Sequence, residues 1–467
     1  MAYSHYERLS AVDAVFLEIE SESSPMHVGA VAIFDPGPLS GPEGGFDIDR
    51  FRSFVESKLE PRYRQRIARI PLTNHPIWVD DPRFNLHYHV RHVGLPHPGD
   101  ERQLKRLAGH VMSQPLDRSK PLWELWLVEG LAESRFAVII KAHHCMMDGV
   151  GSADLLTASM QITPEAVVPA PRPWLPRPAP GPADFALGEV GRRVGDGLAA
   201  LRGLRAAAGH PRRAFASLRS SVAGLGEALG AGMHRASPTP LNIEIGPHRR
   251  FDWLRYDLRH VKEVKNRLGG TVNDVVLANV SGALRRFLSD RGERVADLDF
   301  RAMLPVNIRT REEAGAFGNR VATVAARLPL DEPDPRRRLE RVIETTRELK
   351  ASKLVQGIET LEEISEWGLG QLFVQFARLT ALARPFNVVV TNVPGPQVQA
   401  YLLGAPLRAV YPLVPLFENQ ALGIALFSYN GGLFWGLNAD WDALPDLHEL
   451  VRALAVDFEA LLKAAGV

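Results

Sequence analysis

Hydrophobic and polar positions in the first third of the chain alternate in blocks that predict a mixed α/β unit. Short apolar runs rich in branched side chains predict strands, and apolar residues spaced three and four positions apart predict helices. The predicted strands span residues 28–34, 123–129 and 136–142, and the predicted helices span residues 48–59 and 104–112. The last of these strands is an almost continuous apolar run, which is typical of a strand inside a sheet.

The pattern breaks at residue 164 and resumes near Phe251. Proline recurs between residues 164 and 182, which blocks both helices and interior strands. A stretch rich in Ala, Leu, Gly and Arg follows and predicts helices with a basic face. Beyond it, the predicted helices span residues 258–268, 273–288, 335–353 and 445–462, and the predicted strands span residues 298–305, 320–328, 386–390, 422–429 and 433–438. We therefore predict two α/β domains, residues 1–163 and 248–467, joined by a Pro-rich linker and a helical insert over residues 164–247.

Length and composition indicate a globular protein of more than one domain. A chain of 467 residues exceeds what one hydrophobic core usually organises, so a cleft between domains is expected. The net charge of +1 gives no overall basic field that would attract nucleic acid. The single cysteine, Cys145, excludes an intramolecular disulfide. Neither a secretory signal nor a run of about 18 apolar residues is found, so we expect a cytoplasmic protein that meets membranes only peripherally.

Two histidines follow the apolar run, within the segment HHCMMDG at residues 143–149. The polar start of a further helical pattern at Ser152 places this segment on a loop between a strand and a helix. Histidine can remove a hydroxyl proton and return it to a leaving group because its ordinary pKa is near 6.5. Gly149 would keep the loop free of a side chain near that base, and Asp148 would hold the loop through a charge pair. The spacing predicts acid–base chemistry here.

Other interpretations of the same segment remain open. A histidine pair that closes a strand is often a satisfied structural pair. Zinc binding is disfavoured because consecutive side chains of a strand point to opposite faces, which leaves no second ligand at a usable spacing. A nucleophilic Cys145 is disfavoured because its side chain diverges from that of His144. We expect Cys145 to be a small buried hydrophobic residue.

Several ordered segments resemble the bacterial wax ester synthase/diacylglycerol acyltransferase family over nearly the whole chain. In the first half they are residues 9–17, 25–29, 115–118, 121–124 and 143–149. In the second half they are residues 273–278, 303–309, 318–320 and 391–396. The resemblance implies two chloramphenicol-acetyltransferase-like domains of mixed sheets around an active-site channel. It also implies that His144 is the catalytic base, with His143, Asp148 and Gly149 completing the motif.

The remaining motifs allow a structural and a functional interpretation. Asn273 and Asp274 either cap a helix or act at the site. Pro121, Leu122 and Trp123 are expected to form a strand entrance whose tryptophan fills the core, in preference to a substrate contact. Thr391 and Asn392 either form a turn or line the thioester site.

The resemblance implies transfer of a long-chain acyl group from acyl-CoA to diacylglycerol or a fatty alcohol, which gives triacylglycerol or a wax ester. No cofactor or metal is expected beyond the acyl-CoA substrate. One alternative is a condensation-type enzyme that uses another acceptor or a carrier-bound donor, although the chain carries no carrier module. A second alternative is a catalytically silent lipid-binding protein of the same fold. The sequence leaves the acyl length, the preferred acceptor, the oxyanion-stabilising group and the oligomeric state open.

The Arg-rich insert offers a means of reaching an insoluble substrate. Its basic residues could contact anionic headgroups while its leucines lie against acyl chains. We therefore expect peripheral association with a membrane or a lipid-droplet surface. The alternative is a solvated bridge that packs its apolar face on the two domains.

Asp148 is expected to pair with an arginine, for which Arg309 is the candidate.

Overall fold

The computed structural model describes most of the two predicted domains and parts of the linker. The described residues are 6–39, 46–71, 73–146, 160–165, 167–171, 173–181, 184–185, 188, 191, 235–307, 321–352 and 385–467. The α-helices are α1 (Ala11–Ile19), α2 (Ile48–Lys58), α3 (Leu86–His89), α4 (Glu101–Ser113), α8 (Leu258–Leu268), α9 (Val272–Ser289), α10 (Pro335–Ala351) and α13 (Leu447–Ala465). Short 3-10 helices span Pro61–Arg64, Ala132–Ser134 and Val295–Asp297. The Arg-rich insert, Asp148, Gly149 and Arg309 lie outside the described residues.

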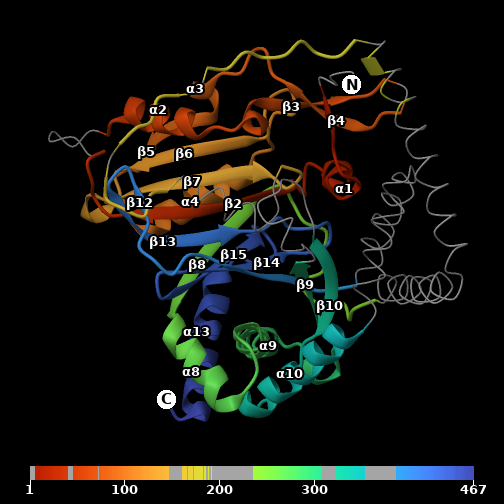
Figure 1. The fold of residues 1–467 in the computed structure, drawn as a ribbon. Coiled ribbons are helices and arrows are strands. Elements are labelled where there is room, and N and C mark those ends of the chain that lie inside the picture. The colour runs from red at the N-terminus through yellow and green to blue at the C-terminus, as the bar shows by residue number, and fades with distance from the viewer. Residues whose placement is uncertain are drawn as a thin grey trace, which may run out of the picture.

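The strands form two six-stranded sheets and one small sheet (Figure 1). The first sheet has the order β12 (Tyr401–Leu402), β13 (Ala405–Leu413), β2 (His27–Phe34), β7 (Phe136–His143), β6 (Trp123–Glu129) and β5 (Val90–Gly94). The second has the order β10 (Val321–Arg327), β9 (Arg301–Asn307), β11 (Val388–Pro394), β14 (Leu422–Tyr429), β15 (Gly432–Asp440) and β8 (Arg249–Asp257). The small sheet contains β1 (Glu7–Arg8), β4 (Pro76–Asp80) and β3 (Gln65–Arg69).

Both large sheets combine parallel and antiparallel strands. In the first sheet β2, β7 and β6 are antiparallel neighbours, whereas β5 pairs with β6 in parallel. In the second, β11 is parallel to both β9 and β14, and the outer pairs are antiparallel. The core of the first sheet also includes Phe251, Trp253 and Phe434 of the second sheet. A separate core lies between the second sheet and α8, α9, α10 and α13, which cover the face of that sheet that lies away from the first (Figure 1). The predicted mixed α/β fold is confirmed.

The first sheet is completed by a strand from the far end of the chain. β13 pairs antiparallel with β2, so that Val31 lies opposite Tyr411. The ring of Tyr411 stacks on Trp253 of β8 at 4.6 Å, which couples the two sheets. Gly436 of β15 permits this approach, because a Cβ there would lie 1.8 Å from the carbonyl oxygen of Pro412. The two sheets are therefore not built from separate halves of the sequence.

The described part of the Pro-rich linker is extended and is fixed to the small sheet. Arg177 donates to both carboxylate oxygens of Asp80, at 3.0 and 2.9 Å. The guanidinium of Arg64 lies 5.3 Å from the ring of Trp174. Asp80 is buried, so this pair holds the linker against the first domain.

Several predicted elements match the structure residue for residue. Residues 123–129, 258–268 and 422–429 form their predicted elements without any shift of boundary. The strand expected at residues 298–305 instead begins at Arg301, because a 3-10 turn precedes it. The strand expected at residues 386–390 extends through Thr391 and Asn392 to Pro394.

Candidate functional site

The histidine segment leaves the sheet at the C-terminal end of β7 and turns at once. His143 is the last residue of β7, and its N–H donates to the carbonyl oxygen of Leu122 at 2.9 Å. The N–H of His144 donates to the carbonyl oxygen of Met26 at 2.8 Å, and that of Met146 closes the turn onto His143 at 2.9 Å. Carbonyl oxygens just before β6 and β2 therefore fix this turn by accepting its hydrogen bonds. We call residues 143–146 the histidine turn.

The two histidine side chains have different environments. The ring of His143 is buried, and its Nδ1 accepts a hydrogen bond from the N–H of Cys145 at 3.1 Å. An accepting Nδ1 carries no proton, so the proton of the neutral ring is on Nε2. That nitrogen lies 3.4 Å from Oε1 of Glu20. His144 is only partly buried, and its ring stacks on Phe16 of α1 with 3.9 Å between centroids and 11° between planes.

Glu20, immediately after α1, carries a negative charge close to His143. Its Oε2 accepts from Nε and Nη2 of Arg118 at 3.0 and 2.5 Å. Its Oε1 accepts from the N–H of Met26 at 3.1 Å. Burial raises the pKa of Glu20, but the contacts with His143 and Arg118 outweigh burial and lower the pKa to about 2. Glu20 is therefore a carboxylate throughout the physiological pH range.

Two further titratable groups lie on the same face of the first sheet. Lys141 is fully buried and donates to the carbonyl oxygens of Val111 and Gln114 at 2.9 and 2.5 Å, at the end of α4. Burial lowers the pKa of Lys141 to about 8. His27 lies opposite His143 in the β2–β7 pairing, and burial together with Lys141 and His143 lowers its pKa well below the ordinary value. His27 is accordingly neutral.

Cys145 lies in the turn but is shielded. Its side chain is buried, and burial, followed by the nearby Asp13 and Glu20, raises the pKa of the thiol well above its ordinary value. Because the thiolate is the nucleophilic form, this environment does not activate the sulfur. The turn therefore offers histidine side chains, and not an activated thiol, for acid–base chemistry.

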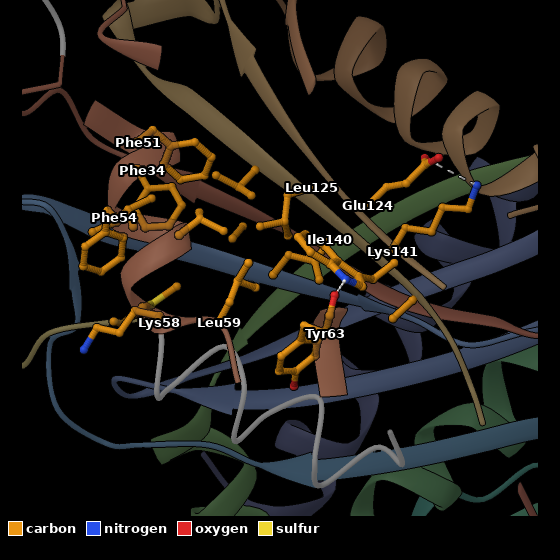
Figure 2. A pocket seen from close by; sticks show the side chains of 17 residues that line it. Phe34, Phe51, Phe54, Lys58, Leu59, Tyr63, Glu124, Leu125, Ile140 and Lys141 are labelled. Carbon is orange, nitrogen blue, oxygen red and sulfur yellow. Dashed lines mark hydrogen bonds and ion pairs between the residues drawn. The ribbon is translucent and has the colours of Figure 1, made fainter. Parts of the chain in front are cut away.

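An apolar pocket opens between α2 and the first sheet (Figure 2). Small residues of the sheet, Ala32 and Ala142, leave the space, and Phe51 and Phe54 of α2 cover it. The other lining residues are Phe34, Val55, Lys58, Leu59, Tyr63, Trp123, Glu124, Leu125, Val138, Ile140, Lys141, Met160 and Leu402. Ala142 precedes His144 by two residues, so one wall of the pocket continues into the histidine turn. The channel that the resemblance implies between the domains stays a prediction.

The Pro-Leu-Trp segment contributes to both the core and the pocket. Leu122 is fully buried, and its carbonyl oxygen receives the His143 hydrogen bond described above. Trp123 is 5% exposed, and its Nε1 donates to the carbonyl oxygen of Tyr63 at 2.7 Å. Its ring stacks on His89 at 4.6 Å. The tryptophan is thus a core residue that also lines the pocket.

The structure brings the two motifs of the second half together. Nδ2 of Asn392, on β11, donates to Oδ1 of Asn273, in the first turn of α9, at 2.6 Å. The N-cap of α9 is Thr271 rather than Asn273, and it forms a capping box with Asp274. Asp274 also accepts from the hydroxyl of Thr346 of α10 at 2.7 Å. Asp274 thus stabilises the start of α9 and contacts α10, and Asn273 meets Asn392 near the C-terminal end of β11, an interior strand of the second sheet.

Glu20 is a site residue that the sequence did not reveal, and Phe16 and Arg118 were recognised only as members of motif segments. No spacing connects them, because Glu20 lies 98 positions from Arg118 and contacts it only in the fold. Among the described residues, no three His, Cys, Asp or Glu side chains cluster as metal ligands would. None of the helices in the described ranges is long and apolar enough to cross a membrane.

Comparisons with known proteins agree with the resemblance. The model of the wax ester synthase/diacylglycerol acyltransferase catalytic domain matches residues 9–276, and that of the C-terminal domain of the same enzymes matches residues 317–462. A putative diacylglycerol O-acyltransferase of Mycobacterium tuberculosis is 34% identical over 98% of this chain and 91% of its own length.

Solved structures share the fold. The wax ester synthase/diacylglycerol acyltransferase of Marinobacter aquaeolei VT8 is 26% identical, with a TM-score of 0.69 over 98% of this chain and 100% of that one. The first condensation domain of the CDA synthetase has a TM-score of 0.59 at 17% identity, over 99% of this chain and 97% of that one. The second likeness concerns the fold alone.

Proposed function

We propose that this chain, which belongs to the wax ester synthase/diacylglycerol acyltransferase family, transfers a long-chain acyl group from acyl-CoA to the hydroxyl of diacylglycerol or a fatty alcohol. The observation that supports this proposal most directly is the position of His144. His144, a partly buried residue, follows Ala142, a wall residue of the apolar pocket, by two positions. In this proposal the acyltransferase has its base, His144, close in sequence to its acyl site.

In the proposed reaction His144 takes the proton of the acceptor hydroxyl while the oxygen attacks the thioester carbonyl. The tetrahedral intermediate then collapses, the C–S bond breaks, and the imidazolium returns the proton to the departing thiolate. The products are an ester and free CoA, and the histidine is restored. The acyl group passes directly between the substrates, so no acyl-enzyme is formed. The shielded thiol of Cys145 is consistent with this direct route.

The proposal is tested by measuring thiol release from purified protein with a long-chain acyl-CoA. Addition of diacylglycerol or hexadecanol should start thiol release, and the corresponding triacylglycerol or wax ester should form in equal amount. A burst of thiol without acceptor, accompanied by acylated protein in the mass spectrum, contradicts direct transfer. Lack of turnover with every alcohol, but acylation of an amine or use of a carrier-bound donor, supports the condensation-type alternative.

The pocket beneath α2 is proposed to hold the acyl tail of the donor. Its walls are almost wholly apolar side chains, which suit an acyl tail. Ala32 of β2 lies opposite Val138 of β7, and both line the pocket. A larger side chain at position 32 would therefore shorten the space for the acyl tail without touching the histidine turn.

Ala32→Leu should change the preferred acyl length. We expect turnover with long-chain acyl-CoA to fall by about tenfold or more, because rejection of extra methylenes by a filled pocket is worth that much. Turnover with a short-chain acyl-CoA serves as the internal control and should stay near that of the wild type. Equal loss at every chain length, or an unchanged length profile, would show that the tail binds elsewhere.

Association with a lipid surface is proposed from the basic residues of the insert at residues 185–235. Near an anionic surface each such charge contributes about 1 kcal/mol of binding free energy. Arg202, Arg205, Arg212 and Arg213 changed to Gln should weaken co-flotation with anionic liposomes at low salt. Neutral liposomes are the control, since headgroup attraction is absent there. Equal, salt-independent binding of both proteins to both liposomes contradicts this role.

A further inference from the structure

The end of α1 contacts both histidines of the turn. Phe16, in the penultimate turn of the helix, stacks on His144, and Glu20, the residue that follows the helix, approaches His143. Neither Phe16 nor Glu20 is adjacent to the turn in sequence. The histidine turn is therefore held from outside the sheet by one short helix.

The carboxylate of Glu20 joins three separate segments at this point. It accepts from the N–H of Met26 and from Arg118, and it lies 3.4 Å from Nε2 of His143. Met26 in turn offers its carbonyl oxygen to the N–H of His144. Glu20 therefore holds Met26, which accepts the backbone hydrogen bond of His144, and it also contacts His143.

Arg118 gives this carboxylate a fixed orientation. Besides its two hydrogen bonds to Glu20, Nη2 of Arg118 donates to the carbonyl oxygen of Leu17 in α1 at 2.9 Å. The side chain of Glu20 is 11% exposed, whereas that of Arg118 is 45% exposed. The carboxylate therefore points inward to the histidine turn, and the arginine closes it off from solvent.

We propose that Glu20, oriented by Arg118, is the positioning residue of the histidine turn and sets where the His144 ring meets the acceptor hydroxyl. The inference rests on the proposed function, because it assumes that His144 is the base. Glu20 acts through Met26 and His143 and does not touch the reacting atoms. Its loss displaces the base while leaving the substrate sites in place, so kcat should fall and KM should change little.

Glu20→Ala and Glu20→Gln test the inference in the full-length enzyme, with Glu22→Gln as the matched control at an exposed carboxylate two residues away. We expect Glu20→Ala to lower kcat by about 10- to 100-fold, the loss that a misplaced catalytic group causes. Glu20→Gln should recover part of that loss, because its amide oxygen can still accept from Met26. Glu22→Gln should match the wild type. Melting curves establish that each variant is folded, and Arg118→Gln, at a half-exposed side chain, repeats the test should Glu20→Ala not fold.

Combination with His144→Ala separates positioning from a general effect on the fold. If Glu20 acts through the base, Glu20→Ala should cause no further loss when His144 is already absent. Equal fold losses in both backgrounds would overturn the inference, as would a wild-type kcat for Glu20→Ala beside an impaired His144→Ala. A wild-type rate for His144→Ala itself contradicts the proposed function instead, so the two failures are distinguishable.

Discussion

Two carboxylate–arginine pairs, one in each half of the molecule, differ in how deeply they are buried and in what surrounds them. Glu20 meets Arg118 at the edge of the histidine turn, where the arginine is 45% exposed. Asp457 of α13 meets Arg338 of α10 at 2.5 Å among the helices beneath the second sheet, where the arginine is 2% exposed. Several donors lower the pKa of Glu20 to about 2, whereas burial outweighs Arg338 and raises the pKa of Asp457 to about 6.

The contrast shows that similar charge pairs have different consequences in the two halves. Arg338 also donates to the carbonyl oxygen of Ala278 in α9, so the second pair connects three helices. The first pair connects α1 and β2 to a turn that carries a candidate base. We therefore expect changes in the second half to alter stability and changes at the histidine turn to alter turnover.

His144→Ala should give the largest effect and should affect turnover alone. We expect kcat to fall by about 10²–10⁴-fold, as removal of a general base does, while the melting temperature changes little because the ring is only partly buried. Acyl-CoA turnover and a melting curve on the same preparation measure both quantities. Cys145→Ala, at the next position, is the control and should remain active. Near wild-type turnover of His144→Ala would exclude it as the base.

Gly282→Ala should destabilise the second half without altering the chemistry. A Cβ at Gly282 of α9 would lie 2.0 Å from Oδ1 of Asp457 and 2.3 Å from Nη2 of Arg338, so the pair must separate. Disruption of a buried pair typically costs about 3–5 kcal/mol of unfolding free energy. Denaturant unfolding measures the loss, and Gly246→Ala, whose Cβ would make only ordinary contact at 3.7 Å, is the control. Unchanged stability would contradict the role of this pair.

The smallest expected effect is a difference in pH dependence between Glu20→Gln and Asp457→Asn. The lowered pKa of Glu20 means that its contribution to stability is present above pH 4.5 and is lost as pH falls toward 2. The raised pKa of Asp457 has the opposite sign, so its contribution is present below pH 3.8 and is lost as pH rises through about 6. The unfolding free energy of Glu20→Gln should therefore approach that of the wild type as the pH falls toward 2. The unfolding free energy of Asp457→Asn should instead rise relative to the wild type as the pH rises through about 6. If the unfolding free energies of the two variants changed with pH in the same way, the two carboxylates would not differ as described.

Local patterns in the sequence predicted most of the central elements. The apolar runs of β6, β7 and β14 and the periodic α8 and α9 were recognisable because burial on a sheet or against one face leaves a regular pattern. The turn that follows β7 was recognisable from its histidines and from the family motif. These features depend on residues that are close in sequence.

Features that depend on distant residues were not predicted. β8 alternates charged and aromatic residues, and β13 contains two prolines, so neither resembles a buried strand. Glu20 was missed because its partners, Arg118 and His143, come near it only after β2, β6 and β7 pair. Asp274 was expected either to cap α9 or to act at the site. Its contact with Thr346 of α10, 72 positions away in the sequence, could not be predicted.

The crossing of β13 into the first sheet also determines when the catalytic half of the molecule can mature. During synthesis the ribosome delivers β2 and β7 long before residues 405–413, so β2 waits with one edge unpaired. A nascent chain that already contains both histidines therefore lacks the strand that completes their sheet. Such late pairing is slow and leaves an edge open to association with other chains. The sheet that carries the histidine turn can therefore be completed only late in synthesis, and chaperones that cover strand edges should influence the yield of active protein.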